Sequence, residues 1–176
     1  MCAKRTARGN IPLEWKTDVV NITDTTSATP VTGEFDLDLL PDEIAEILSI
    51  DSTIDPGSLG IIDNPVSLGM YLSMDPDADD DPLVLGNIED LEVFFSHYLR
   101  QEISAVTAAS VFFQNKVSKK QQDLPEKYPI LIGTNFSQVV NGVSTVDVSV
   151  SFITTVYFKR KKASGLDLAN ILLKRR

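Results

Sequence analysis

The sequence predicts a mainly β protein built from antiparallel strands. Apolar and polar residues alternate at period two wherever a period is visible, which is typical of strands with one buried face. The clearest cases lie in residues 34–39, 66–74 and 145–158. Clusters of Pro, Gly, Asp and Asn separate such segments, and about eight strands are expected. Strands in that number favour a sandwich, a barrel or a related two-sheet fold.

The dipeptide Asn141-Gly142 predicts a tight hairpin turn, because both of its residues tolerate a positive φ angle. Residues 136–140 would form the strand before the turn, and the alternating segment that ends at Phe158 would form the strand after it. Weaker strand candidates are residues 18–23, 47–54, 103–113 and 128–132.

Two helices are expected within this β pattern. Asn87 can cap an inserted helix whose apolar residues recur at helical spacing. Its apolar residues are Leu91, Phe94, Phe95, Tyr98 and Leu99. Ser164, with Asp167 three residues later, resembles a capping box for a short final helix that carries Leu168, Ile171 and Leu172 on one face. Residues 41–48 could form a third helix or a turn that leads into a strand.

The length of 176 residues fits one domain with a core of its own. We expect a basic N-terminal arm in residues 1–16, a single β domain in residues 17–158 and a basic tail in residues 159–176. Cys2 is the single cysteine, so packing rather than an internal disulfide must hold the fold. No apolar run reaches the length that a membrane-spanning helix needs, and a folded, soluble protein is expected.

Charge is strongly segregated along the chain. Residues 17–99 contain no Lys or Arg, yet they hold nineteen of the twenty-five Asp and Glu residues. Basic residues at the two ends can attract nucleic acid or a membrane surface, or can lie against neighbouring subunits. The alternative is that the oppositely charged segments fold together into one neutralised surface. The candidate interior-facing or phosphate-facing residues are Lys4, Arg5, Arg8, Lys159, Arg160, Lys161, Lys162, Lys174, Arg175 and Arg176.

An Asp-rich segment, residues 75–81, offers alternating carboxylates for a cation. Asp75, Asp77 and Asp79 are candidate ligands, and calcium is the candidate ion because it prefers hard oxygen donors. An EF-hand is excluded, since Asp80 stands where that loop needs Gly, and Gly86 where it needs Glu. The other interpretation is a solvated loop, and no other cofactor is expected.

Catalytic motifs are absent from the sequence. His97 is the single histidine, without a partner Cys or a nucleophile motif, and a structural role is expected for it. We therefore expect no enzymatic activity and no small-molecule substrate. Trp15, the single tryptophan, is expected to anchor the arm either to its own core or to a neighbouring subunit.

In general plan, the chain resembles the single jelly-roll coat proteins of icosahedral viruses. The similar features are the basic start MCAKRTARGN, about eight strands, an inserted helix near residues 91–99 and the basic tail KRKKASGLDLANILLKRR. The resemblance implies an antiparallel β-sandwich of jelly-roll type that assembles with copies of itself, and with other virion proteins, into a shell. It implies a location in the virion after synthesis in the host cytoplasm, with the basic ends toward nucleic acid or an internal membrane. The arm is shorter than the arginine-rich arms of many RNA-packaging coats.

Two other classes stay open. A subunit of a filament, tail or surface layer would also self-assemble, but into open arrays. A monomeric β-sandwich that binds a ligand, with the Asp-rich segment as a cation-binding loop, would not assemble. Whether the purified protein forms closed shells, open arrays or monomers distinguishes these three classes.

Overall fold

Nine strands form two antiparallel sheets in the part of the chain that the structure, a computed structural model, describes. The described residues are 12–27, 29–55, 66–75, 77–84, 92–103, 110–118, 130–133, 135–145, 147 and 149–167. The strands are β1 (Leu13–Ile22), β2 (Val31–Phe35), β3 (Glu43–Asp55), β4 (Val66–Ser73), β5 (Val93–Ile103), β6 (Ser110–Ser118), β7 (Ile130–Ile132), β8 (Phe136–Ser144) and β9 (Val150–Lys162). The predicted mainly β class is therefore confirmed.

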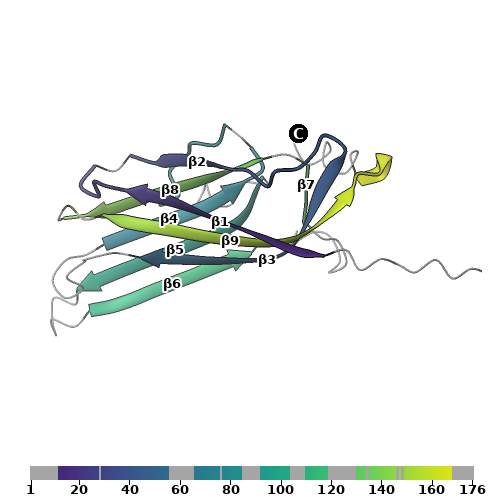
Figure 1. Ribbon diagram of the computed structural model, residues 1–176. Helices are drawn as coiled ribbons and strands as arrows, with labels where there is room; N and C mark the ends of the chain where they lie inside the picture. Colours follow the sequence, from purple (N-terminus) through teal and green to yellow (C-terminus); the bar gives the residue numbers. More distant parts are fainter. Residues whose placement is uncertain are drawn as a thin grey trace, which may run out of the picture.

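The two sheets pack face to face as a β-sandwich (Figure 1). The four-stranded sheet has the order β1-β9-β3-β7, and the five-stranded sheet has the order β2-β8-β4-β5-β6. Early strands pair with late ones in a nested series: β1 with β9, β2 with β8, β3 with β7, and β4 with β5. Successive pairs alternate between the sheets, so the chain resembles one long hairpin wrapped into a sandwich.

The core lies between the two sheets. In β9 the even-numbered residues from Val150 to Phe158 are buried and the odd-numbered ones are half-buried, as the alternation predicts. On the core side of the five-stranded sheet, Phe35 stacks on Phe136 with ring centroids 4.8 Å apart, and Phe94 meets Phe136 edge to face at 5.2 Å. These rings join β2, β5 and β8 of the five-stranded sheet.

The hairpin predicted at Asn141-Gly142 is wrong. Both residues lie inside β8, which pairs with β4, while β9 belongs to the other sheet. A Cβ atom on Gly142 would come within 2.8 Å of Leu68 Cδ2. The glycine therefore allows close packing in the sandwich rather than a turn.

The inserted helix is also wrong, because residues 93–103 form strand β5. The first half of this strand is buried on both sides: Phe94 and Phe95 reach the core, whereas Val93 packs on the outer side with Tyr71. A bulge in the pairing with β4 interrupts the alternation near this point. When both faces of a strand are buried, apolar residues no longer alternate with polar ones, and their spacing can resemble that of a helix.

The weaker predicted strands agree with the observed strands only in part. Strands β1, β3 and β7 cover most of the segments expected at residues 18–23, 47–54 and 128–132, and residues 41–48 form a turn followed by β3. The segment expected at residues 103–113 is divided between the end of β5 and the start of β6. Strands β1 and β9 also run past the boundaries expected at residues 16 and 158, so Trp15 and Arg160 are strand residues.

The final helix begins as predicted. Ser164 N donates to Asp167 Oδ2 at 3.1 Å, and Asp167 N donates to Ser164 Oγ at 3.2 Å, which is a reciprocal cap. The apolar face expected at Leu168, Ile171 and Leu172 lies outside the described residues. No helix in the described part of the chain is long and apolar enough to cross a membrane.

Candidate functional site

Part of the outer face of the five-stranded sheet is covered by the protein's own chain, while Phe113 and Val143 on the same face stay exposed. Tyr71, Val93 and Val139 form a buried cluster there, with Ala78 packed against it. The Tyr71 hydroxyl donates a hydrogen bond to the Asp80 carbonyl at 3.0 Å. Burial raises the pKa of this hydroxyl, and the Asp80 carboxylate adds to the effect, so the group stays a neutral donor. The loop after β4 therefore acts as a strap over this face.

The candidate calcium ligands lie in the same loop. Asp75 Oδ1 accepts a hydrogen bond from Asp77 N at 3.0 Å, and the Asp77 and Asp79 side chains are exposed. Asp81 Oδ1 accepts from Leu83 N and from Asn141 Nδ2, both at 2.9 Å. No group of three His, Cys, Asp or Glu residues suited to a metal occurs among the described residues. These carboxylates shape the loop and attach it to β8, and the calcium site stays a prediction.

The outer face of the four-stranded sheet is open along β1 and β9. Its side chains, which we call the β1–β9 face, are Leu13, Trp15, Thr17, Val19, Asn21, Ser151, Ile153, Thr155 and Tyr157. Trp15 lies opposite Tyr157, and Val19 lies opposite Ile153. Trp15 is 68 % exposed, so in the described part of the molecule it does not anchor β1 to the core. These side chains are uncharged, Lys159 follows them on the same side of β9, opposite Leu13, and the Trp15 ring is in solvent.

The basic segment at residues 159–162 lies within the four-stranded sheet. It forms the end of β9 and pairs with the start of β3, where Lys162 lies opposite Glu43 and Lys159 lies opposite Glu46. The acidic and basic parts of the sequence therefore meet here within one chain.

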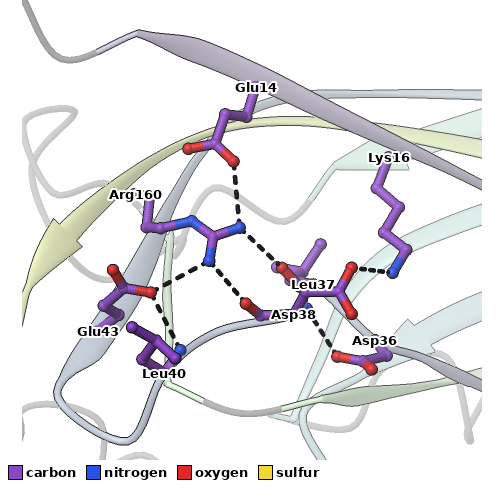
Figure 2. Close-up of polar contacts among 8 residues, drawn as sticks. All are labelled: Glu14, Lys16, Asp36, Leu37, Asp38, Leu40, Glu43 and Arg160. Atoms are coloured by element: carbon purple, nitrogen blue, oxygen red, sulfur yellow. Dashed lines mark hydrogen bonds and ion pairs between the residues drawn. The ribbon is translucent and has the colours of Figure 1, made fainter.

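Arg160 is the centre of a polar cluster at this end of the sandwich (Figure 2). Its Nη2 donates to Glu14 Oε2, and its Nη1 donates to Glu43 Oε2, both at 3.1 Å. The same guanidinium donates to the carbonyls of Asp38 (2.6 Å) and Leu37 (3.3 Å). Hydrogen bonding to Glu14 and then to Glu43 raises the pKa of Arg160 above its ordinary value. One side chain thus joins β1, β3, β9 and the loop after β2.

Lys16 holds the same loop from the other side. Its Nζ donates to Asp38 Oδ2 at 2.6 Å, and this contact lowers the pKa of Asp38. Asp38 has a φ angle of 54°, a left-handed conformation that Asp tolerates better than most residues. Asp38 N also donates to Asp36 Oδ1 at 2.7 Å. The loop is therefore fixed over the end of the core by Lys16 and Arg160.

The neighbouring lysines of β9 also have acidic partners. Lys161 Nζ lies 3.8 Å from Glu46 Oε2 and 3.6 Å from Asp167 Oδ1, and Lys162 Nζ lies 3.4 Å from Asp42 Oδ2. Lys159 lies in β9 opposite Glu46, and the remaining candidate basic residues lie outside the described residues. These are Lys4, Arg5, Arg8, Lys174, Arg175 and Arg176.

His97 forms a buried polar link between the two sheets. Gln114 Nε2 of β6 lies 2.8 Å from His97 Nε2, and Ser52 Oγ of β3 lies 2.7 Å from His97 Nδ1. With the Gln114 amide as donor, the neutral ring accepts at Nε2 and donates Nδ1–H to Ser52. Ser52 Oγ therefore accepts a hydrogen bond from His97 Nδ1–H. A nucleophilic serine needs the reverse arrangement, in which a neighbouring base accepts the proton of its hydroxyl. Burial, helped by the positive charge of Lys116, lowers the pKa of His97 to about 4.

The Arg160 cluster was missed at the sequence level, although the alternation contains a sign of it. Arg160 continues the even-numbered, inward-facing side of β9, and Glu14 has the same parity as buried Val20 in β1. A charged residue at an inward position needs partners, and an acid at an inward position of another strand can supply one. Which strands are neighbours could not be read from the sequence.

Replacing Arg160 by Gln should lower the free energy of unfolding by about 2 kcal/mol. The change removes two charge-assisted hydrogen bonds and leaves Glu43, which is only partly exposed, without its cation. Urea unfolding followed by circular dichroism measures the effect. The matched control is Lys162→Gln, because Lys162 is 85 % exposed and its single ion pair should contribute less than about 0.5 kcal/mol. Equal effects of the two changes would contradict the assigned role of Arg160.

No protein-family model matches the chain, and no curated protein matches it.

Proposed function

We propose that this protein is a self-assembling coat subunit with a jelly-roll fold. The observation that carries the proposal is the nested pairing of β1 with β9, β2 with β8, β3 with β7, and β4 with β5, with successive pairs in alternate sheets. A long antiparallel hairpin wrapped in this way generates the two four-stranded sheets of a jelly roll. Strand β6 is then an addition at the edge of one sheet.

The difference between the two outer faces supports an assembly role. The strap of residues 77–84 lies over the five-stranded sheet, whereas the β1–β9 face leaves Trp15, Leu13 and Val19 in solvent. Exposed apolar residues with polar neighbours are typical of protein interaction sites, and Trp is enriched among the residues that dominate binding energy. The β1–β9 face is therefore the proposed contact with other copies.

The rigidity of the sandwich supports the same role, because a subunit that sets shell geometry needs a fixed shape. The Arg160 cluster holds three strands of one sheet and the loop after β2, while His97 joins the two sheets. When a rigid subunit contacts several neighbours, its shape determines the geometry of the assembly, and the contacts form cooperatively. No chemical step is needed.

The proposal divides the basic residues into two groups. Arg160, Lys161 and Lys162 already pair with acids of the same chain, so they contribute to the fold. Contact with nucleic acid or an internal membrane is therefore assigned to Lys4, Arg5, Arg8, Lys159, Lys174, Arg175 and Arg176. Such contact should weaken with rising salt, as phosphate binding does.

The state of the purified protein tests the proposal. Light scattering and negative-stain imaging should show closed shells of uniform size. Filaments or flat arrays would instead support the tail or surface-layer class. A stable monomer of 19.4 kDa would overturn both and favour the ligand-binding class.

Trp15→Ser should raise the concentration needed for assembly at least about tenfold, because truncating a central interface Trp costs about 2 kcal/mol or more. The matched control is Val84→Ser, which removes an apolar side chain that is 51 % exposed on the strap. Light scattering against protein concentration measures both variants, and circular dichroism checks their fold. Unchanged assembly of the Trp15 variant would remove the β1–β9 face from the proposal.

A further inference from the structure

Strand β1 presents a long free edge of the four-stranded sheet. Within the described residues it pairs with β9 alone, along all ten of its residues. Unpaired N–H and C=O groups on such an edge are a template for another strand. Two of the other sheet edges are short, β7 with three residues and β2 with five, and β6, with nine, is the second long edge.

The inward side of β1 carries opposite charges two residues apart. Lys16 lies opposite Val156 and Asp18 lies opposite Thr154, so both project from the even-numbered side of the strand. Inward charges on an edge strand ordinarily oppose pairing with another chain. A pair of opposite sign becomes complementary, however, when two copies meet antiparallel about the residue between them.

Three central registers can be compared for two antiparallel copies of β1. Centred on Lys16, the pairing sets Lys16 against itself and Glu14 against Asp18, and centred on Asp18 it sets Asp18 against itself. Centred on Thr17, it sets Lys16 of each copy against Asp18 of the other. Like charges directly opposite are unfavourable and unlike charges are favourable, so of these three registers charge favours the one centred on Thr17. A register centred on Trp15 would set Lys16 against Glu14, but the Glu14 carboxylate already accepts a hydrogen bond from Arg160.

The Thr17 register also suits the outer side of the strand. It places Trp15 of each copy opposite Val19 of the other, which covers two of the exposed apolar residues of the β1–β9 face. Thr17 meets its own copy at the two-fold axis. Lys16 can keep its contact with Asp38 and still reach the second copy, because an ammonium group has three donors.

We propose that two copies of the chain pair edge to edge through β1, antiparallel and centred on Thr17, and join their four-stranded sheets into one sheet of eight strands. The partner at this edge is a second copy of the chain. This inference rests on the proposed function, because it names the first contact through which the subunits assemble. The contact is self-complementary, as a two-fold interface must be.

Charge reversal at two positions tests the register. Lys16→Asp and Asp18→Lys each set like charges against one another in two places, so each variant alone should dimerise at least about tenfold more weakly than the wild type. In an equal mixture, the aspartate introduced at position 16 meets the lysine introduced at position 18, and the two native residues also meet. The mixture should therefore form heterodimers, seen by native mass spectrometry with one variant mass-tagged.

The matched control is Asp38→Asn. It removes the partner of Lys16 within the chain, leaves β1 intact and keeps a residue that tolerates the left-handed conformation, so association should not change. Circular dichroism on every variant confirms the fold. A mixture no more associated than its components would overturn the proposed register.

Failure of the inference and failure of the proposed function give different results. Shells that form normally from both charge-reversed variants would overturn the β1 contact and leave the coat function standing. Dimers that respond to the charge swap, without larger assemblies, would support the β1 contact and count against the coat function. A wild-type monomer at all concentrations would overturn both.

Discussion

Replacing Phe136 by Ala should lower the free energy of unfolding by about 3–5 kcal/mol, the cost of truncating a large core side chain that leaves a cavity. Phe136 is 1 % exposed, stacks on Phe35 and meets Phe94 edge to face. Three strands of the five-stranded sheet thus lose their common contact. Urea unfolding followed by fluorescence and by circular dichroism measures the loss.

Phe113→Ala is the matched control, since it makes the same chemical change at a ring that is 53 % exposed on β6. Its effect should stay within about 0.5 kcal/mol, as for most surface changes. If both variants lost the same stability, the aromatic contacts around Phe136 would not be a centre of the core.

Acidification from pH 7 to pH 4 should lower the free energy of unfolding by about 3 kcal/mol through His97. The pKa of this residue is about 4 in the folded protein, against 6.5 ordinarily. The unfolded chain therefore takes up the proton at a higher pH than the folded chain does. Stability is fully present above about pH 6.5 and is lost progressively as the pH falls toward 4, where the loss is largely complete.

His97→Gln isolates this contribution, because a Gln side chain keeps polar atoms beside Ser52 and Gln114 but does not titrate. Unfolding free energies measured every half unit between pH 7 and 4.5 should fall more steeply for the wild type than for the variant. Parallel curves would show that His97 does not link protonation to stability. Carboxylates titrate in both proteins, so their contribution cancels in the comparison.

Much of the fold could be predicted from alternation, and its failures have physical causes. Strand β9 shows period two clearly because one side meets the core and the other meets solvent. Strand β5 does not, because both sides of its first half are buried and a bulge shifts its register. Gly142 looked like a turn residue because the sequence does not reveal that Leu68 crowds it.

The candidate site could be predicted only in part. Trp15 stands out as the single tryptophan, but its exposure depends on the side of β1 from which it projects. That strand begins at Leu13, five residues before the start expected from the sequence. The sequence places Arg160 in a basic tail, yet its partners Glu14 and Glu43 lie 146 and 117 residues away in the sequence. Contacts across such distances depend on strand order, which local patterns do not encode.

The nested strand order also determines when the contact surface comes into existence during synthesis. Thr17 and Thr155, whose hydroxyls lie 2.9 Å apart, are separated by 138 residues, so β1 has no sheet to join until the ribosome has made nearly all of the described chain. Pairings of such long range are slow because loop closure precedes any gain in contacts. A nascent chain therefore lacks a finished β1 edge until β9 has emerged, and the contact proposed at this edge would form only after that.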